Sequence, residues 1–454
     1  MKDFCSKFRN SILILTALIM YLLCALLFFL LFSIDNPEII DLSRTAAVTL
    51  STYFLFMLLL SVIYGRYDVR KRKEKETVFS LTVTHILTDL VTYFELTIMK
   101  TNDANNRSFT IENVGILFLV FILQIFVIIV FTKLGGKFCL WIFDKEKCLV
   151  ITKDIKAGER IKDALSAFDN RYTVNGIISY ESGELEKEML KADTVVLYEV
   201  PVGIRTEISD FCYQNLKNFY FNPHIADILE QNSRPAALDD ISFFTWDFHL
   251  ISFEERIIKK LMDIVISVLL IILLSPILII SAVCIKKYDG GSILFKQKRA
   301  TANGRIFEIY KFRTMREHVE NRSVTKDDDR VTRPGRILRK YRIDELPQLF
   351  NILKGDMSLV GPRPEMLENV EDYERSLPEF RYRLRMKAGL TGYAQIYGKY
   401  NTSSQDKLML DIMYIENYSI FKDIQILFQT IMVLFKAEDS TEAFSDKDPG
   451  KNGG

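Results

Sequence analysis

The sequence predicts a membrane protein of the α/β class, with a four-helix transmembrane bundle, a cytosolic α/β domain and a mostly helical C-terminal domain. Three observations predict this organisation. Four apolar segments lie within residues 1–136, and short apolar strands alternate with amphipathic stretches over 137–235. A fifth apolar segment then opens a charged region, 257–437. A chain of 454 residues has room for several such units.

The amino-acid composition limits which residue types could carry catalysis in this protein. Hydrophobic residues make up 49% and charged residues 26% of the chain, so apolar and charged residues occupy separate blocks. The net charge of +1 gives no sign of a nucleic-acid partner, and we expect none. The six cysteines form no C-x-x-C pair and the four histidines lie far apart, which argues against a zinc site or a Ser-His-Asp triad. Any catalysis therefore falls to carboxylates and basic residues.

The apolar segments of the N-terminal part have the length of membrane spans. We expect spans at 11–33, 45–64, 77–99 and 114–132. The first is too long for a signal peptide and is followed by no cleavage site. The third contains His85, Asp89 and Glu95, so we expect it to pack against its neighbours rather than face lipid.

Charge sets the orientation of these spans. The basic run at 65–75 is expected in the cytoplasm, and the segments 34–44 and 100–112, with few basic residues, outside. Four crossings then return the chain to the cytoplasm at Lys133. Everything that follows is expected to be cytosolic.

The predicted α/β domain covers 137–235. Its expected buried strands are CLVIT, VNGIIS and TVVLYEV, separated by amphipathic stretches that predict helices and a parallel sheet. No G-x-G-x-x-G follows the first strand, so a structural or dimerising role is preferred to dinucleotide binding. A connector is expected at 236–256 and a disordered tail at 438–454.

The fifth apolar segment, 261–285, is predicted to enter the membrane without crossing it. Basic residues flank both of its ends, and placing either group outside is disfavoured. Ser275 and Pro276 lie in its middle, where proline removes a helical hydrogen bond and the serine hydroxyl could bond the freed carbonyl. The alternative is a proline-kinked fifth span, which would put 286–454 outside.

The candidate catalytic residues lie C-terminal to this apolar segment. Asp344 and Glu345 follow a basic segment that starts near Pro334, and a carboxylate at a helix entrance stays ionised. An ionised aspartate beside arginines can attack phosphorus while a neighbouring glutamate holds a divalent cation, although the pair could equally be a helix cap. Arg363 lies between two prolines, a rigid mount for binding phosphate or simply a surface loop.

Together these segments resemble the polyprenyl-phosphate hexose-1-phosphate transferases, the bacterial sugar transferases. The resemblance runs from about Arg256 to Phe435. It rests on the Ser275-Pro276 break, IYKFRTM (309–315), DELPQLFNILKGDMSLVGPRPE (344–365) and GLTGYAQ (389–395). The four spans and the α/β domain are similar to those of the larger members, in which that domain is a degenerate Rossmann-like fold. Tyr393 stands where many relatives have tryptophan.

The resemblance implies a function. Hexose-1-phosphate would pass from a UDP-hexose, with glucose or galactose expected, to undecaprenyl phosphate at the start of exopolysaccharide, capsule or O-antigen synthesis. Asp344 would be the nucleophile of a covalent phospho-sugar intermediate, and Glu345 would hold Mg²⁺. Substrate-binding roles fall to Lys311, Arg313, Arg339, Gln348 and Arg363.

The resemblance also implies a re-entrant helix with its break at Ser275 and Pro276, in a multi-pass protein of the bacterial inner membrane with a cytoplasmic catalytic domain. We further expect a homodimer. Two alternatives stay open: direct displacement without a covalent intermediate, and a non-catalytic scaffold of a polysaccharide assembly complex.

Overall fold

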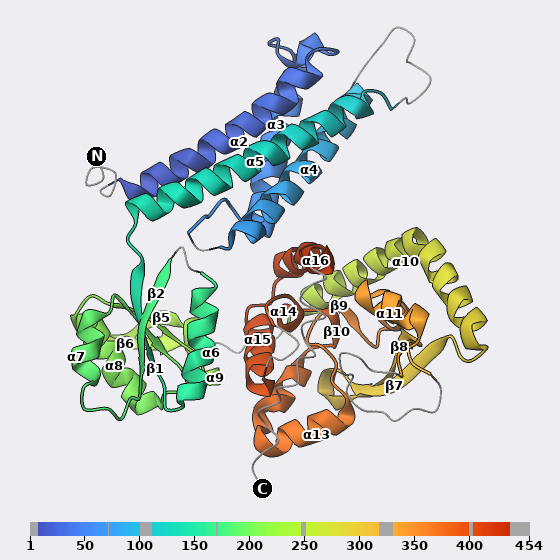
Figure 1. Cartoon of the computed structure of the whole chain (residues 1–454). Coiled ribbons are helices and arrows are strands. Elements are labelled where there is room, and N and C mark those ends of the chain that lie inside the picture. Colours follow the sequence, from blue (N-terminus) through green and yellow to red (C-terminus); the bar gives the residue numbers. More distant parts are fainter. Residues whose placement is uncertain are drawn as a thin grey trace. The chain divides into compact units, whose positions relative to one another are not determined.

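The computed structural model describes residues 8–70, 72–99, 111–168, 171–246, 251–316, 330–398 and 403–435 (Figure 1). The chain divides into two compact units, Met1–Asn222 and Pro223–Gly454. The first contains four long helices and a parallel sheet. The second contains the charged C-terminal region.

The N-terminal helices form where the apolar segments predict them. They are α2 (Arg9–Phe32), α3 (Arg44–Tyr64), α4 (Glu74–Met99) and α5 (Val114–Ile142), with the short 3₁₀ helix η1 (Pro37–Ile39) after α2. All four long helices are long and apolar enough to cross a membrane. Helix α5 continues ten residues beyond the predicted end of the fourth span at 132, because no proline interrupts it and its last turns need not be apolar to remain helical.

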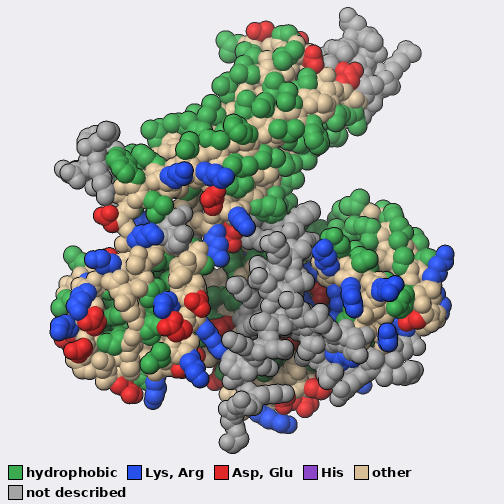
Figure 2. All heavy atoms as spheres, viewed as in Figure 1, with side chains coloured by type: hydrophobic (Ala, Val, Ile, Leu, Met, Phe, Trp, Pro, Cys, Tyr) green, Lys and Arg blue, Asp and Glu red, His purple; other side chains and the backbone are tan. Residues whose placement is uncertain are grey.

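These helices pack along their length, α2 against α5 and α4 against both α3 and α5. Aromatic side chains pack from the middle of the helices towards one end, where Phe28 contacts both Phe32 and Tyr53. Figure 2 shows hydrophobic side chains over the sides of α2–α5. Lysine and arginine gather at the end where α5 leads into the sheet, and acidic side chains at the other end. This is the surface expected of helices within a bilayer.

The first unit ends in a parallel sheet with the strand order β2-β1-β3-β4. The elements are β1 (Glu146–Ile151), α6 (Ile155–Ser166), β2 (Tyr172–Ile178), α7 (Leu185–Lys191), β3 (Thr194–Leu197), α8 (Val202–Gln214) and β4 (Asn218–Phe221). The predicted parallel α/β arrangement is confirmed. Strand β4 is additional; it is short and exposed along its length, so it gave no pattern of buried residues to recognise.

The second unit begins with α9 (Ile225–Gln231) and a hairpin of β5 (Arg234–Leu238) and β6 (Ile241–Thr245), which occupies much of the predicted connector. The elements after the long helix α10 (Phe253–Asp289) are β7 (Leu294–Ala300), η2 (Ala302–Gly304), β8 (Ile306–Phe312), α11 (Arg333–Lys340), η3 (Ile343–Glu345), α12 (Gln348–Lys354), β9 (Ser358–Val360), α13 (Leu367–Ser376), η4 (Pro378–Arg385), β10 (Gly389–Thr391), α14 (Tyr393–Ile396), α15 (Ser404–Glu416) and α16 (Ile420–Phe435). The predicted tail, 438–454, lies outside the described residues.

Helix α10 has 37 residues and is visibly bent (Figure 1). A capping box of Ser252 and Glu255 starts it, and Gly290 in the left-handed region ends it. Pro276 lies inside it and provides no N–H for the carbonyl of Ile272, which instead accepts the Ser275 hydroxyl at 2.8 Å. The first half of α10 packs against the main core of the unit, and the second half against a smaller cluster that contains Phe312 and Leu338. The middle of α10 exposes apolar side chains, including Leu273 at 74%.

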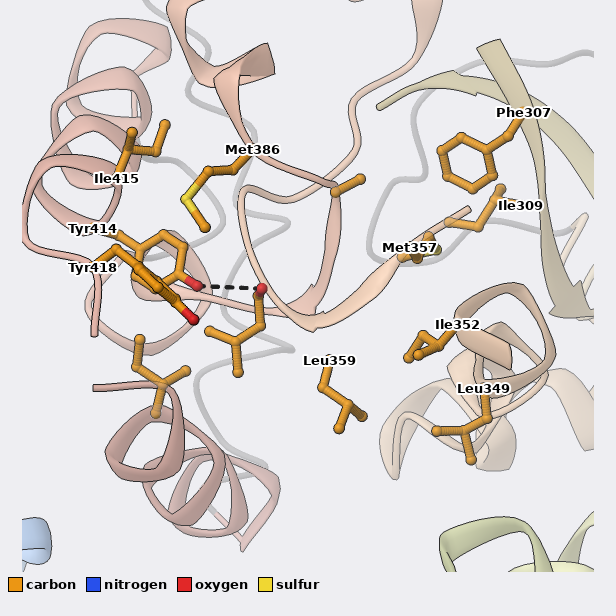
Figure 3. Packing of buried hydrophobic residues seen from close by; sticks show 13 residues of the cluster. Phe307, Ile309, Leu349, Ile352, Met357, Leu359, Met386, Tyr414, Ile415 and Tyr418 are labelled. Atoms are coloured by element: carbon orange, nitrogen blue, oxygen red, sulfur yellow. Dashed lines mark hydrogen bonds between the residues drawn. The ribbon is translucent and has the colours of Figure 1, made fainter. Parts of the chain in front are cut away.

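The main core of this unit lies where β9, β10, α12 and the last two helices meet (Figure 3). Leu349, Leu359 and Tyr414 are almost completely buried in it. The Tyr414 hydroxyl donates to the carbonyl of Val360 at 3.3 Å, drawn as the dashed line in Figure 3. Parallel pairing of β9 with β10 brings Gly361 and Gly389 into contact, and a Cβ at Gly389 would lie 2.1 Å from the Gly361 nitrogen. This core therefore fixes the backbone that leads into Arg363.

Candidate active site

Asp344 and Glu345 lie in the 3₁₀ turn η3, between helices α11 and α12. Arg342 has φ 54°, a left-handed conformation that turns the chain out of α11 into η3. The acidic pair therefore precedes α12 by a short turn rather than occupying the helix entrance itself. Asn351 holds α12 against β8, since its amide donates to the Glu308 carbonyl at 2.7 Å and accepts the Tyr310 N–H at 2.9 Å.

Two cations converge on Glu345. Lys311 Nζ, from β8, lies 2.9 Å from Glu345 Oε1, and Arg363 Nη2 lies 2.8 Å from the same oxygen. Three segments that are distant in the sequence thus meet at one carboxylate. Such charge-assisted hydrogen bonds fix side chains more firmly than neutral ones.

The two carboxyls have opposite pKa shifts. Burial, followed by the charge of Glu345, raises the pKa of Asp344 above its ordinary value, although Lys311 and Arg363 oppose the rise. Burial also disfavours the charged form of Glu345, but Arg363 and Lys311 outweigh it and hold the pKa of Glu345 well below its usual range. A proton arriving at the pair goes to Asp344, so Glu345 is the permanent anion. Divergent shifts of this kind are common at catalytic carboxyl pairs.

Arg339 is positioned by a close contact between α11 and the segment that follows β8. Gly335 on α11 sits so near this segment that a Cβ would lie 2.2 Å from the Thr314 carbonyl oxygen. That approach lets Arg339 Nε donate to Thr314 Oγ1 at 2.8 Å. Arg339 also lowers the pKa of Asp344 through its charge, which places it within electrostatic reach of the acidic pair.

A buried arginine, Arg383, fixes the backbone of the loop that carries Arg363 (361–364). Arg383 Nη2 donates to the Arg363 carbonyl at 2.7 Å and lies 2.6 Å from Asp411 Oδ2. Arg383 is 4% and Asp411 1% exposed, so this pair is structural rather than available to solvent. Sequence analysis missed both residues. Neither Arg383 nor Asp411 lies within a recognisable sequence motif, so nothing in the sequence indicates their role.

A second buried network joins α10 to the same loop. Lys259 Nζ donates to the Val360 carbonyl at 3.0 Å and to Asp423 Oδ2, and Asp263 Oδ1 accepts the Leu359 N–H at 3.0 Å. These residues also went unnoticed in the sequence. The one available signal was an acidic residue, Asp263, near the start of a segment that is otherwise apolar.

The other predicted substrate-binding residues lie differently. Arg313 is 6% exposed and its guanidinium pairs with Asp289 at the end of α10. Gln348 is 3% exposed at the start of α12. The structure therefore gathers Lys311, Glu345 and Arg363 directly, and ties Arg313 to the end of α10.

An open hollow adjoins the loop, with about 340 Å³ of empty space. Its walls combine charged side chains with apolar ones, among them Arg363, Glu365, Arg383, Phe380 and Met386. Arg363 thus contacts Glu345 and borders this hollow as well.

The acidic pair suits a hard divalent cation. Within the described ranges no cluster of three or more histidine, cysteine or acidic residues forms a complete metal cage. Mg²⁺ commonly binds through one or two carboxylates and completes its coordination with water and substrate phosphates. Asp344 and Glu345 provide that kind of donor set.

Known proteins share the segment that contains this site. The profile of the family "Bacterial sugar transferase" matches residues 254–437, the segment that holds every residue of the site. A UDP-glucose:undecaprenyl-phosphate glucose-1-phosphate transferase of Caulobacter vibrioides is 40% identical over 190 residues, which cover 40% of this chain and 71% of that protein. The chain belongs to the bacterial sugar transferase family.

Other relatives in this family differ in the sugar they are named for. A UDP-N-acetylgalactosamine-undecaprenyl-phosphate N-acetylgalactosaminephosphotransferase of Aeromonas hydrophila is 43% identical over 39% of this chain and 43% of its own length. An undecaprenyl-phosphate galactose phosphotransferase of Salmonella typhimurium is 35% identical over 41% of this chain and 42% of its own length. The match thus spans less than half of these two relatives.

Proposed function

We propose that this protein transfers a sugar-1-phosphate from a UDP-hexose to undecaprenyl phosphate, giving undecaprenyl diphosphate-hexose and UMP. The observation that carries the proposal is the Asp344–Glu345 pair, with Glu345 held by Lys311 and Arg363 inside the matched segment. The names of the relatives supply the reaction class.

In the first half-reaction, an ionised Asp344 oxygen attacks the β-phosphorus of the UDP-hexose. The bond from that phosphorus to the bridging oxygen breaks, and UMP leaves with the oxygen and the electron pair. In the second half-reaction, a phosphate oxygen of undecaprenyl phosphate attacks the same phosphorus and releases Asp344. One diphosphate linkage replaces another, so no external energy source is needed.

The basic residues serve the charge that develops during transfer. Lys311 and Arg363 neutralise Glu345 and face the acidic pair, and Arg339 contributes positive charge from α11. Positive groups fixed in advance around phosphorus lower the barrier because little reorganisation is required. Gln348 and Arg313 would support this arrangement, Arg313 through its contact with α10.

Mg²⁺ fits the same place. Glu345 and Asp344 would hold it together with the donor's phosphate oxygens. When bound, it would offset phosphate charge as a Lewis acid. The protein's own cations already neutralise Glu345, so its charge does not have to be balanced by the metal alone.

Helix α10 would bring this chemistry to the membrane as a re-entrant helix. Straight, its 37 residues would extend about 55 Å, well beyond a hydrocarbon core of about 30 Å. Its first half buries Lys259, Asp263 and Ser267, and its second half buries Ser281 and Ile285, all against the same unit. Because both ends pack against the same unit, we expect the exposed apolar middle to dip into one leaflet and return rather than to cross.

The distribution of basic residues predicts how the N-terminal helices are oriented in the membrane. Basic residues at the end of the helices where α5 leads into β1 favour the cytoplasmic side of the inner membrane for that end. UDP-sugars are cytoplasmic substrates, so the catalytic unit would lie where its donor is. The homodimer and a role at the start of polysaccharide synthesis are parts of the same proposal.

UMP release tests the function. Purified protein in lipid vesicles with undecaprenyl phosphate and Mg²⁺ would be given UDP-glucose, UDP-galactose and UDP-N-acetylgalactosamine in turn. Release with one donor that is absent in Asp344→Asn would support transfer and identify the sugar. A folded protein that releases no UMP from any of them would favour a scaffold.

A further inference from the structure

Polar side chains from three of the N-terminal helices meet halfway along them. His85 and Asp89 come from α4, Tyr53 from α3 and Gln124 from α5. Each lies close to the middle of the part of its helix expected within the bilayer. All four are at most 1% exposed. These four side chains have no role in the proposed sugar-phosphate transfer.

The side chains contact one another but leave polar atoms unpaired. Gln124 Nε2 donates to Asp89 Oδ1 at 3.3 Å and to the Cys24 carbonyl of α2 at 3.1 Å. The Tyr53 hydroxyl lies 3.4 Å from His85 Nδ1. His85 Nε2, Asp89 Oδ2 and Gln124 Oε1 have no hydrogen-bond partner among the described residues. Unpaired polar atoms at this depth are costly and commonly functional.

No fixed positive charge offsets Asp89. The titratable groups around this cluster are Cys24 of α2, Tyr53 of α3 and His85 of α4, with Tyr21 of α2 beside His85, while α5 contributes the neutral Gln124. In the described part of the chain, no lysine or arginine pairs with Asp89. A carboxylate without a counter-charge in hydrocarbon is strongly disfavoured. The neutral, protonated form of Asp89 is therefore favoured among the described neighbours.

A row of buried hydroxyl side chains lies along α4 beside this group. Thr84, Thr88 and Thr92 are fully buried along the same face, each with its hydroxyl bonded to the carbonyl four residues earlier. Towards the basic end, Ser80 meets Arg72 at 3.3 Å. Towards the acidic end lies a hollow of about 280 Å³ lined by Asn36, Glu112 and five other residues.

We propose that Asp89, with Gln124 and His85, forms a proton-binding site inside the N-terminal helices. A proton taken from water converts the Asp89 carboxylate to a neutral carboxyl. Its O–H becomes a donor for the unpaired Gln124 Oε1 or for His85. The site needs no protein cation, which distinguishes it from Glu345 and Asp423 of the catalytic unit, each of which lies against a lysine or arginine.

Carbodiimide labelling tests this site, because dicyclohexylcarbodiimide modifies protonated carboxyls in apolar surroundings. The full-length protein in lipid vesicles would be labelled across a pH series and the adducts located by peptide mass spectrometry. We expect an adduct on Asp89 that is lost as the pH rises, is absent in Asp89→Asn, and does not form on Asp423, which is buried beside Lys259. Suppression by Na⁺ at constant pH would overturn the proton assignment in favour of a sodium site.

Thermal stability gives a second, independent readout. Asp89→Asn keeps the shape of the neutral acid. It should match the wild-type melting temperature at acidic pH and exceed it at alkaline pH, where wild-type Asp89 loses its proton. A variant that is less stable than wild type by the same amount at every pH would show that the ionised carboxylate is required, and would overturn the proposal.

Discussion

Buried carboxylates are neutralised differently in the two units of this protein. In the C-terminal unit, Glu345 lies against Lys311 and Arg363, and Asp423 against Lys259. In the N-terminal helices, Asp89 lies against the amide of Gln124. Nearby cations stabilise the charged form of a carboxylate, whereas burial among neutral groups disfavours it. Glu345 thus stays charged between its two cations, whereas the proposed site at Asp89 would change its charge by binding a proton.

The largest effect is expected from the nucleophile itself. Asp344→Asn keeps the size of the side chain but removes the attacking oxygen anion, and should reduce UMP release by about 10⁴-fold or more. Steady-state assays with the preferred donor would measure it. Arg375→Ala, which removes an exposed arginine that pairs with its own helix neighbour Asp372, is the matched control and should keep full activity. An active Asp344→Asn enzyme would exclude nucleophilic catalysis.

The next largest loss of activity is expected for substitutions of Arg363. Arg363→Ala removes one of the two cations on Glu345 and should lower kcat by about 10²–10³-fold. Arg363→Lys restores the charge without the planar fork, so we expect partial recovery. If the lysine variant is no better than the alanine variant, geometry rather than charge determines the role of this residue.

The Lys259–Asp423 pair should matter mainly for stability. Lys259→Met leaves Asp423 buried without its cation and should cost about 3–5 kcal/mol. The double variant Lys259→Met/Asp423→Leu should regain most of that loss, as measured by the melting temperature in detergent. If the double variant is instead less stable than the single one, the pair contributes net stability of its own.

The pH profile reports the raised pKa of Asp344. Because attack requires the ionised form, activity should fall as pH drops through that pKa, and the midpoint should lie above the ordinary aspartate value. Lys311 lowers the pKa of Asp344. Lys311→Met should therefore move the acidic limb to higher pH, measured as kcat/KM against pH. A limb that stays in place would show that another group controls it.

The smallest effect on catalysis is expected at Asp89. Asp89→Asn should leave UMP release at neutral pH within about twofold of wild type, because Asp89 lies outside the catalytic unit. A loss comparable to that of Arg363→Ala would mean that the two units are coupled, and the contrast between them would have to be revised.

Local signals in the sequence revealed part of this arrangement. Hydropathy located α2–α5, and the motif around Asp344 located the acidic pair, since both depend on neighbouring residues. The Lys259–Asp423 pair joins residues 164 positions apart, and Arg383 reaches the Arg363 carbonyl across 20, so only the folded core reveals them. Strand β4 and the β5–β6 hairpin were missed because they are short and largely exposed.

The covalent intermediate is the most direct test of the account. The purified protein would be incubated with a UDP-hexose labelled in the β-phosphate and with no undecaprenyl phosphate, then denatured and digested. The account predicts labelled sugar phosphate on the peptide that contains Asp344, released when undecaprenyl phosphate is added before denaturation. UMP formation that requires the lipid acceptor, with no labelled peptide, would contradict it and indicate direct displacement.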